Sequence, residues 1–369
     1  MLRIHSVPTT GTPVRRRAPW GALAATVVSA SLLVAGCSSA SEADPTPATV
    51  EATTDATADK SAAPEPVLPT TWALTGVRAT ELVNRPALAI KVENSREARP
   101  QTGLEYADVV WEEVVEGGIT RYIAVYHSQV PETVGPIRSV RPMDSTIIAP
   151  LAGLMAFSGG QAPFVQSVRD AGLQVISNDA GAAGFYRTKD RRAPHNVFGT
   201  PATFLEQADA SHQDSPQSEF VFAADAAQAT AAVSGAPTSS IDVVMSSYSR
   251  PTWAWDEASG TFLRSEGTTP ALSSTGAQLA ATNVVVLTVT MVDTAFSDPA
   301  GTPVPETQVV GSGEAVIATG GRSITATWTK PDASTPFSLT AADGTPIALA
   351  PGNTWVELMP TGSGSVTAS

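Results

Sequence analysis

Residues 108–128 read DVVWEEVVEGGITRYIAVYHS, and this stretch decides the fold of the first half of the chain. Two runs that are rich in β-branched and aromatic residues, 108–116 and 119–128, flank the dipeptide Gly117-Gly118. A Gly-Gly pair between two extended runs is typical of a β-hairpin with a two-residue loop. The stretch therefore predicts two adjacent antiparallel strands.

The register of this hairpin brings charged side chains to one face. With Gly117-Gly118 as the loop, Glu112 lies opposite Ile123, and Arg121 lies diagonal to both Glu112 and Glu116, within reach of long side chains. One interpretation is a ligand-binding guanidinium that two carboxylates hold in place. The other is a structural ion network on a partly covered sheet, because such networks also perturb pKa values.

Predicted strands and helices alternate around the hairpin. Helices are expected at 146–154, 161–171 and 201–210, the last with a proline at its start. Strands are expected at 87–92, 155–158 and 173–177. Interleaved elements of this kind indicate an α/β domain with a mixed sheet, which we place at residues 70–225.

The segment 240–360 has a different pattern, and an Ala-rich linker, 226–239, precedes it. Apolar residues alternate with other residues along predicted strands, as at Ile324, Ala326 and Trp328. Turn signals such as Asp343-Gly344 separate these strands. We expect an all-β domain, either a sandwich or a barrel.

The N-terminus carries an export signal. Three arginines, Arg15 to Arg17, precede an apolar run, 20–35, which ends just before the chain's only cysteine, Cys37. This order is typical of a secretory signal and predicts a lipoprotein signal peptide over 1–36, with Cys37 as the lipidated residue. The alternative, an uncleaved anchor helix, is disfavoured because a membrane span needs about 20 apolar residues. General secretion and twin-arginine export both remain open as the route.

Residues 37–69 are rich in Ala, Thr, Ser, Pro, Asp and Glu, and they predict a disordered tether between the membrane and the folded part. Removal of residues 1–36 takes away four arginines and no acidic residue, which leaves 18 basic against 35 acidic residues and a formal charge of −17. Such an acidic chain repels nucleic acid, so no nucleic-acid partner is expected. With Cys37 lipidated and three scattered histidines, we expect no metal site and no cofactor.

A first basic motif is VGPIRSVRPMD at 134–144, between a predicted strand and a predicted helix. Arg138 and Arg141 suit a phosphate or carboxylate through forked hydrogen bonds beside a helix start. The alternative is a structural turn in which Asp144 or Ser145 caps the helix and does no chemistry.

A second basic motif is FYRTKDRRAPHN at 185–196, in an otherwise acidic protein. Arg192 is a candidate ligand-binding residue in this cluster, and His195 is a candidate acid–base group beside Asn196. The alternative is that His195 and Asn196 brace the loop through bonds to the backbone.

These motifs resemble those of the YerB-like lipoproteins, a family built of two modules of unknown function. The resemblance implies the two-module architecture and a location in the cell envelope, without implying a reaction. It covers nearly all of the chain beyond the tether and is carried by Arg99–Leu104, Ala107–Val110, Glu116–Arg121, Gly135–Pro142, Arg192–Asn196, Ala281–Val286 and Pro351–Leu358.

Three functions are compatible with the sequence. The first is a lipoprotein on the outer face of the cell membrane that binds an anionic envelope component or an envelope protein through Arg121, Arg138, Arg141, Arg192 and Asn196. The second is an enzyme that acts on a phosphorylated wall precursor, with His195 as acid–base group and Asp144 or Glu112 assisting. The third is a scaffold that recruits wall-synthesis proteins through its β domain.

Overall fold

The structure is a computed structural model that describes residues 70–369. The expected signal peptide, the lipidation site Cys37 and the tether lie outside these residues. Within them, no helix is both long enough and apolar enough to cross a membrane.

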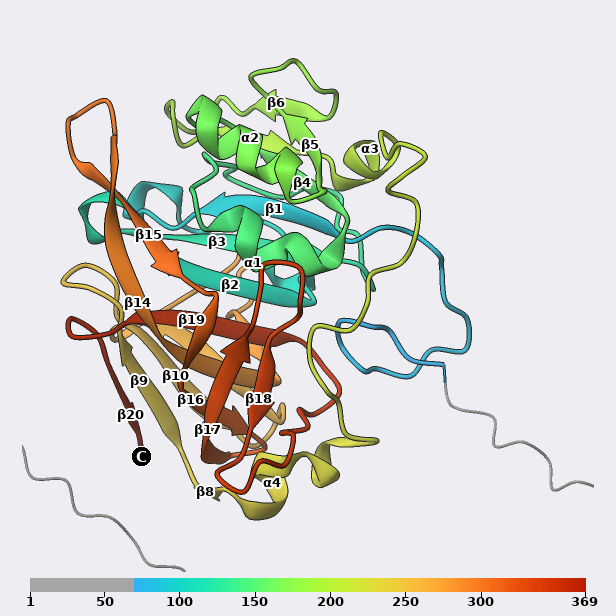
Figure 1. Cartoon of the computed structure of the whole chain (residues 1–369), viewed down its shortest axis with the longest axis vertical. Coiled ribbons are helices and arrows are strands. Elements are labelled where there is room, and N and C mark those ends of the chain that lie inside the picture. The colour runs from blue at the N-terminus through green and yellow to red at the C-terminus, as the bar shows by residue number, and fades with distance from the viewer. Residues whose placement is uncertain (1–69) are drawn as a thin grey trace, which may run out of the picture. The chain divides into compact units, whose positions relative to one another are not determined.

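One twelve-stranded sheet organises the described part of the chain (Figure 1). The path of hydrogen-bonded neighbours is β18 (Ser338–Thr340), β17 (Arg322–Lys330), β16 (Gly311–Thr319), β14 (Asn283–Ser297), β19 (Thr354–Pro360), β2 (Val109–Val114), β3 (Thr120–Tyr126), β1 (Leu88–Glu93), β4 (Leu154–Phe157) and β5 (Gln174–Ser177). Two further strands join at the side, β15 (Pro303–Gln308) beside β14 and β8 (Ala236–Pro237) beside β17.

A second, six-stranded sheet comes from the C-terminal half. Its strands are β12 (Thr269–Pro270), β11 (Thr261–Glu266), β10 (Pro251–Asp256), β9 (Ser240–Val244) and β20 (Ser365–Ala368), with β13 (Ala280–Ala281) beside β11. A third sheet is the pair β6 (Phe185–Arg187) and β7 (Val197–Gly199). The α-helices of the described part are α1 (Asp144–Ile148), α2 (Ala162–Asp170), α3 (Pro201–Leu205) and α4 (Thr230–Ser234).

The predicted fold class, an α/β module followed by an all-β module, is confirmed. The two modules meet at strands β2 and β19, which pair in parallel from Val109 opposite Thr354 to Glu112 opposite Glu357. Figure 1 shows β19 running beside β2. The mixed sheet of the first module thus continues into the strands of the second.

Each face of the large sheet is covered by a different layer. On one face, Trp111 and Ile123 pack with Ile147 of α1 and with Phe164 of α2. On the other face, a second apolar cluster joins Val110, Ala124 and Trp355 to Trp253 and Phe262 of the six-stranded sheet. This second contact is a sheet packed on a sheet, so the sandwich alternative describes it.

The predicted helix over 146–154 is wrong in its extent. Helix α1 ends at Ile148, and Pro150 follows in a short 3-10 turn that Ala152 closes with a φ of 45°. Pro150 has no N–H to donate to the carbonyl of Thr146, so the helical hydrogen-bond ladder cannot continue through it, which explains the early end. Strand β4 then begins at Leu154.

The predicted helix over 201–210 also ends early, at Leu205. The amide side chain of Gln174 bonds the chain just beyond this helix. Its Nε2 donates to the carbonyl of Gln207 (2.6 Å) and its Oε1 accepts from the N–H of Asp209 (2.8 Å). By contrast, the helix and strand predicted at 161–171 and 173–177 are confirmed to within one residue at each end.

The hairpin is present, but the predicted two-residue loop is wrong. Val115 donates its N–H to the carbonyl of Ile119 (2.8 Å), which leaves a three-residue loop, Glu116–Gly118. Gly117 and Gly118 have φ values of 68° and 76°, in the left-handed region that glycine adopts without strain. Loops of three residues with a left-handed glycine are a common second type of hairpin connection.

This longer loop shifts the register by one residue. Arg121 now lies opposite Glu113, and Glu112 lies opposite Tyr122. Because successive side chains of a strand point to opposite faces, the shift places Glu112 on the face away from Arg121. The predicted shared face of Glu112, Glu116 and Arg121 is therefore wrong for Glu112.

Candidate functional site

Strand β1, strand β3 and the loop 134–143 gather the predicted arginines on the helix-covered face of the sheet. Arg121 on β3 lies opposite Glu93 on β1, and the loop carries Arg138 and Arg141 above them. The carboxylates that these arginines meet are Glu93 and Glu116.

Arg121 and Arg141 belong to a buried ion network. The Nε of Arg141 lies 2.7 Å from Oε1 of Glu116, and its Nη2 donates to Oε2 (2.8 Å). Arg121 lies 4.0 Å from the same carboxylate and donates from Nη1 to the carbonyl of Ser139 (3.0 Å). Burial, together with the charge of Arg141, lowers the pKa of Arg121 to about 9. These contacts favour the structural interpretation of the two arginines.

Asp144 is fully buried in a second network on the same face. Its Oδ1 accepts from Nζ of Lys91 (2.8 Å), its Oδ2 accepts from the N–H of Arg141 (2.8 Å), and Lys91 also contacts Glu113. Burial and the nearby charge of Asp144 raise the pKa of Glu113 to about 8. When Glu113 is protonated, the remaining charges of this network are the carboxylate of Asp144 and the ammonium of Lys91, which balance each other.

Glu112 lies on the opposite face, between the two sheets. It contacts Arg264 of β11 and accepts a hydrogen bond from Thr120. Burial alone would raise the pKa of Glu112, but Arg264 and the surrounding hydrogen bonds hold it below its usual value. The guanidinium of Arg264 lies 5.3–5.6 Å from the ring centroids of Tyr122, Trp253 and Trp355, and Glu112 beside it is fully buried.

His195 and Arg138 converge on one buried carboxylate, Glu93. Oε1 of Glu93 lies 2.9 Å from Nδ1 of His195 and 3.3 Å from Nε of Arg138, and it accepts from the hydroxyl of Ser95 (3.0 Å). The side chains of His195 and Arg138 are 25% and 23% exposed, whereas that of Glu93 is 2% exposed. Solvent therefore reaches the imidazole and the guanidinium but not the carboxylate.

A cavity of about 430 Å³ opens beside His195. We call it the histidine cleft, and its lining residues are Glu97, Asp190, Arg191, Arg192, Ala193 and His195. Arg192 is exposed and makes no ion pair with any residue of 70–369. Of the four predicted ligand-binding arginines, Arg192 lines this cavity, Arg138 is linked to it through Glu93, the partner of His195, and Arg121 and Arg141 are buried.

Asn196 and Arg191 shape the loop that carries the cleft. Asn196 accepts from Nη1 of Arg187 (2.8 Å) and donates to the carbonyl of Thr188 (3.0 Å). Arg191 donates to the carbonyls of Ala98 and Pro100 (2.6 Å each). Asn196 therefore braces the loop, as the alternative interpretation expects.

The Glu93–His195 pair defines the chemistry that this site can perform. A carboxylate on Nδ1 fixes the orientation of an imidazole and leaves Nε2 facing outward. Nε2 makes no hydrogen bond within residues 70–369, so it is available to a ligand. In the same range, no group of three or more His, Cys, Asp or Glu side chains is arranged to hold a metal ion.

Glu93 and Lys91 are the residues that sequence reasoning missed. Both follow Ala89 at intervals of two along the strand run LAIKVE, and this alternation places them on the face of Arg121. A charged pair at alternate positions of an otherwise apolar central strand is the signal that points to them.

Comparison with known proteins places this architecture in a family. Residues 74–214 match the N-terminal domain, and residues 241–356 the C-terminal domain, of a family described as a protein of unknown function, DUF3048. The chain therefore belongs to the DUF3048 family, and its two predicted modules correspond to the two domains of that family.

A named relative is the proposed lipoprotein YerB of Bacillus subtilis, so the resemblance to the YerB-like proteins is confirmed. The chain is 35% identical to YerB over 138 residues, which make up 37% of this chain and 41% of YerB. The sequence alignment thus spans less than half of that relative. The crystal structure of the YerB protein from Bacillus subtilis matches with a TM-score of 0.68 and 21% identity over 81% of this chain and 99% of that chain, which shows a shared fold.

Proposed function

We propose that this protein is a lipoprotein that is anchored to the outer face of the cell membrane through Cys37 and binds an anionic component of the cell envelope at the histidine cleft. The name of YerB and the signal-like order of residues 1–37 support the anchor. Residues 37–69 then serve as the tether between the membrane and the binding site.

The convergence of Arg138 and His195 on Glu93, next to the unpaired Arg192, is the observation that carries the binding proposal. Residues 187–195 contain four basic side chains and one acidic side chain, in a chain whose net charge is −13. Guanidinium groups that are held in position by neighbouring acceptors bind phosphate or carboxylate through charge-assisted, forked hydrogen bonds. Within the cleft, Arg191 and Arg192 are accompanied by the acids Glu97 and Asp190, so anion binding there depends on directed bonds from Arg192 and His195 and not on a net positive charge.

An enzyme is the second candidate, and the Glu93–His195 contact favours it. An imidazole held by a carboxylate is a common general acid–base group. On a phosphorylated envelope precursor, Nε2 of His195 would take or give a proton, while Arg138 and Arg192 would stabilise the negative charge that develops. The predicted assistants Asp144 and Glu112 are both fully buried, and neither contacts His195.

Titration calorimetry with inorganic phosphate and with glycerol 3-phosphate tests the binding proposal. We expect the Arg192→Gln and Arg138→Gln variants to bind glycerol 3-phosphate about ten- to a hundredfold more weakly, because each lost charge-assisted bond is worth about 1.5–3 kcal/mol. Arg169→Gln on α2 is the matched control, since Arg169 is exposed and makes no side-chain bond in the described part. Unchanged affinity in Arg138→Gln and Arg192→Gln would contradict binding at the cleft.

Turnover separates the second candidate from the first. If the protein is an enzyme, His195→Gln should abolish hydrolysis or transfer of a phosphorylated wall precursor, while the affinity of the variant for that precursor stays within about threefold. Turnover reports interactions made in the transition state, whereas affinity reports interactions made in the ground state. A protein that binds the precursor and leaves it unchanged is a binding protein.

A further inference from the structure

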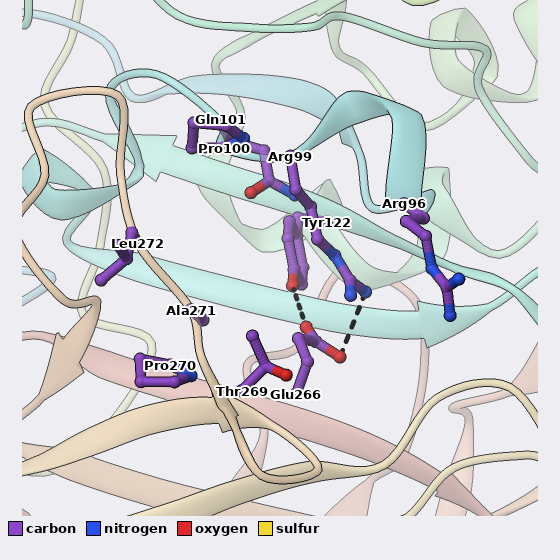
Figure 2. A pocket seen from close by; sticks show the side chains of 10 residues that line it. All are labelled: Arg96, Arg99, Pro100, Gln101, Tyr122, Glu266, Thr269, Pro270, Ala271 and Leu272. Carbon is purple, nitrogen blue, oxygen red and sulfur yellow. Dashed lines mark hydrogen bonds and ion pairs between the residues drawn. The ribbon is translucent and has the colours of Figure 1, made fainter.

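Figure 2 shows a second cavity, of about 480 Å³. It shares a wall with the histidine cleft. The wall is the segment 96–101: its Glu97 lines the histidine cleft, whereas its Arg96, Arg99 and Gln101 line the second cavity. Tyr122, Glu266 and the residues that follow β11 complete the lining. We call this cavity the arginine pocket. Arg191 of the cleft bonds the carbonyls of Ala98 and Pro100 in the same wall, so the two cavities are tied to one rigid segment.

Arg99 is held in place in the arginine pocket. Its Nε donates to Oδ1 of Asn94 (2.9 Å), its Nη2 donates to the carbonyl of Asn94 (3.0 Å), and the same Nη2 lies 3.1 Å from Glu266. Figure 2 shows the ion pair with Glu266 and the nearby hydroxyl of Tyr122 on the same carboxylate. A guanidinium that is already oriented loses little conformational entropy when it binds an anion.

Arg96 supplies a second positive charge that nothing in residues 70–369 neutralises. In Figure 2 its guanidinium points to the same side as that of Arg99 and contacts none of the other labelled residues. Glu266 pairs with Arg99 and with Arg264 (2.9 Å), and Glu112 also pairs with Arg264, so these two arginines balance two carboxylates and Arg96 remains as the surplus charge. The pocket is therefore positive, and a phosphate group, with three acceptor oxygens, can accept from both arginines.

The rest of the lining is apolar. Pro100, Pro270, Ala271 and the 43% exposed Leu272 stand around the two guanidinium groups. Such a surface suits a ligand that carries its phosphate on a carbon skeleton, since sites for organic ligands combine an apolar wall with a few polar groups.

We propose that the arginine pocket is a second anion subsite and that the ligand of the protein is a linear polymer with phosphate groups along a carbon skeleton, which bridges the wall 96–101. This proposal rests on the proposed function, since the histidine cleft is the first subsite. Two subsites on one rigid wall bind a chain with several phosphates more tightly than they bind its repeat unit, because the second contact is intramolecular.

Calorimetry with a glycerol phosphate oligomer and with glycerol 3-phosphate tests the two subsites on the mature protein. The wild type should bind the oligomer at least about tenfold more tightly than the monomer. Arg96→Gln should remove about tenfold of the affinity for the oligomer and leave monomer binding at the cleft within about twofold, the size of a minor change in avidity. Arg192→Gln should weaken the binding of the oligomer and of the monomer, and Arg169→Gln should weaken the binding of neither probe.

Each other outcome has a definite meaning. Equal affinity of Arg96→Gln and wild type for the oligomer overturns the second subsite and leaves the cleft in place. Loss in Arg96→Gln together with unchanged Arg192→Gln overturns the cleft and with it the bridging chain. Equal losses in Arg96→Gln and Arg169→Gln mean that only net charge matters, and binding of neither probe by the wild type overturns both proposals.

Discussion

Glu93 on β1 and His195 ahead of β7 form a carboxylate–imidazole pair, with Oε1 2.9 Å from Nδ1, although 102 positions separate them in the chain. The same oxygen meets Arg138 and the hydroxyl of Ser95. A single buried carboxylate therefore positions two of the candidate ligand-binding side chains. Loss of the Glu93 carboxylate would therefore remove a contact that positions His195 and Arg138 in the ligand-free protein.

The first prediction concerns the contribution of Glu93 to stability. Glu93→Gln keeps the shape of the side chain but removes the charge that Arg138 and His195 share. We expect the free energy of unfolding to fall by about 1–3 kcal/mol, the usual cost of leaving buried polar groups without their partner. Urea denaturation at pH 7 measures it. Glu97→Gln, in the same cleft but exposed, is the control and should match the wild type.

The second prediction concerns the pH dependence of stability. The pKa of Glu113 is raised to about 8 in the folded protein by burial and by Asp144. A raised carboxyl pKa means that the folded state holds its proton more tightly than the unfolded state, so this group's contribution to stability is complete below the unfolded pKa of about 4.5 and is lost as pH rises toward 8.

Glu113→Gln imitates the protonated side chain. In a plot of the free energy of unfolding against pH, it should therefore flatten the downward slope between about pH 4.5 and 8. Part of the slope should remain, because burial also raises the pKa of Glu219 to about 7. Glu314→Gln, at an exposed position of β16, should keep the full slope. A Glu113→Gln profile parallel to that of the wild type would show that Glu113 is charged in the folded state.

The third prediction concerns Arg264, which the rings of Tyr122, Trp253 and Trp355 surround. Arg264→Met preserves length but leaves Glu112 and Glu266 without their main counter-charge. We expect a loss of about 3–5 kcal/mol, as for other broken buried ion pairs. The double variant Glu112→Gln with Arg264→Met should recover part of the loss, and equal losses in the single and double variants would refute a charge effect. Arg250→Met, at an exposed arginine, should have no effect.

The fourth prediction concerns the anchor. Cys37→Ala removes the only thiol and should release the protein from the membrane fraction, because two acyl chains supply about 0.8 kcal/mol per buried methylene and nothing replaces them. Detergent phase partitioning measures this, and Ser38→Ala should remain in the detergent phase. Retention of Cys37→Ala in that phase would point to an apolar anchor instead of a lipid.

Local patterns were enough to predict the fold class and strands β1 to β5 of the first module, but not its short pair β6 and β7. The alternation of apolar residues in the second module and the helix at 161–171 depend on neighbouring residues, and both are present. The register of the hairpin depends on one residue of loop length, which Gly117-Gly118 leaves ambiguous. That single residue decided which face Glu112 occupies.

The partners of the charged residues were beyond prediction because they are distant in sequence. Glu112 meets Arg264 across 152 positions, and Arg141 meets Glu116 across 25. Only the paired strands and the packed sheets bring these side chains together. The basic segment 187–195 was visible as a cluster. Which of its arginines brace the loop depends on the acceptors nearby: Oδ1 of Asn196 for Arg187 and backbone carbonyls for Arg191, whereas Arg192 has no ion pair within 70–369.

The parallel pairing of β2 with β19 affects how this chain reaches its native state. The chain is synthesised from its N-terminus, so β2 is complete while β19 has still to be made. During that interval one edge of the hairpin has open backbone donors and acceptors, which invite pairing with a neighbouring copy. The hairpin therefore completes its pairing only once Thr354–Pro360 has been made, and a chain truncated before Thr354 should be prone to aggregation and proteolysis.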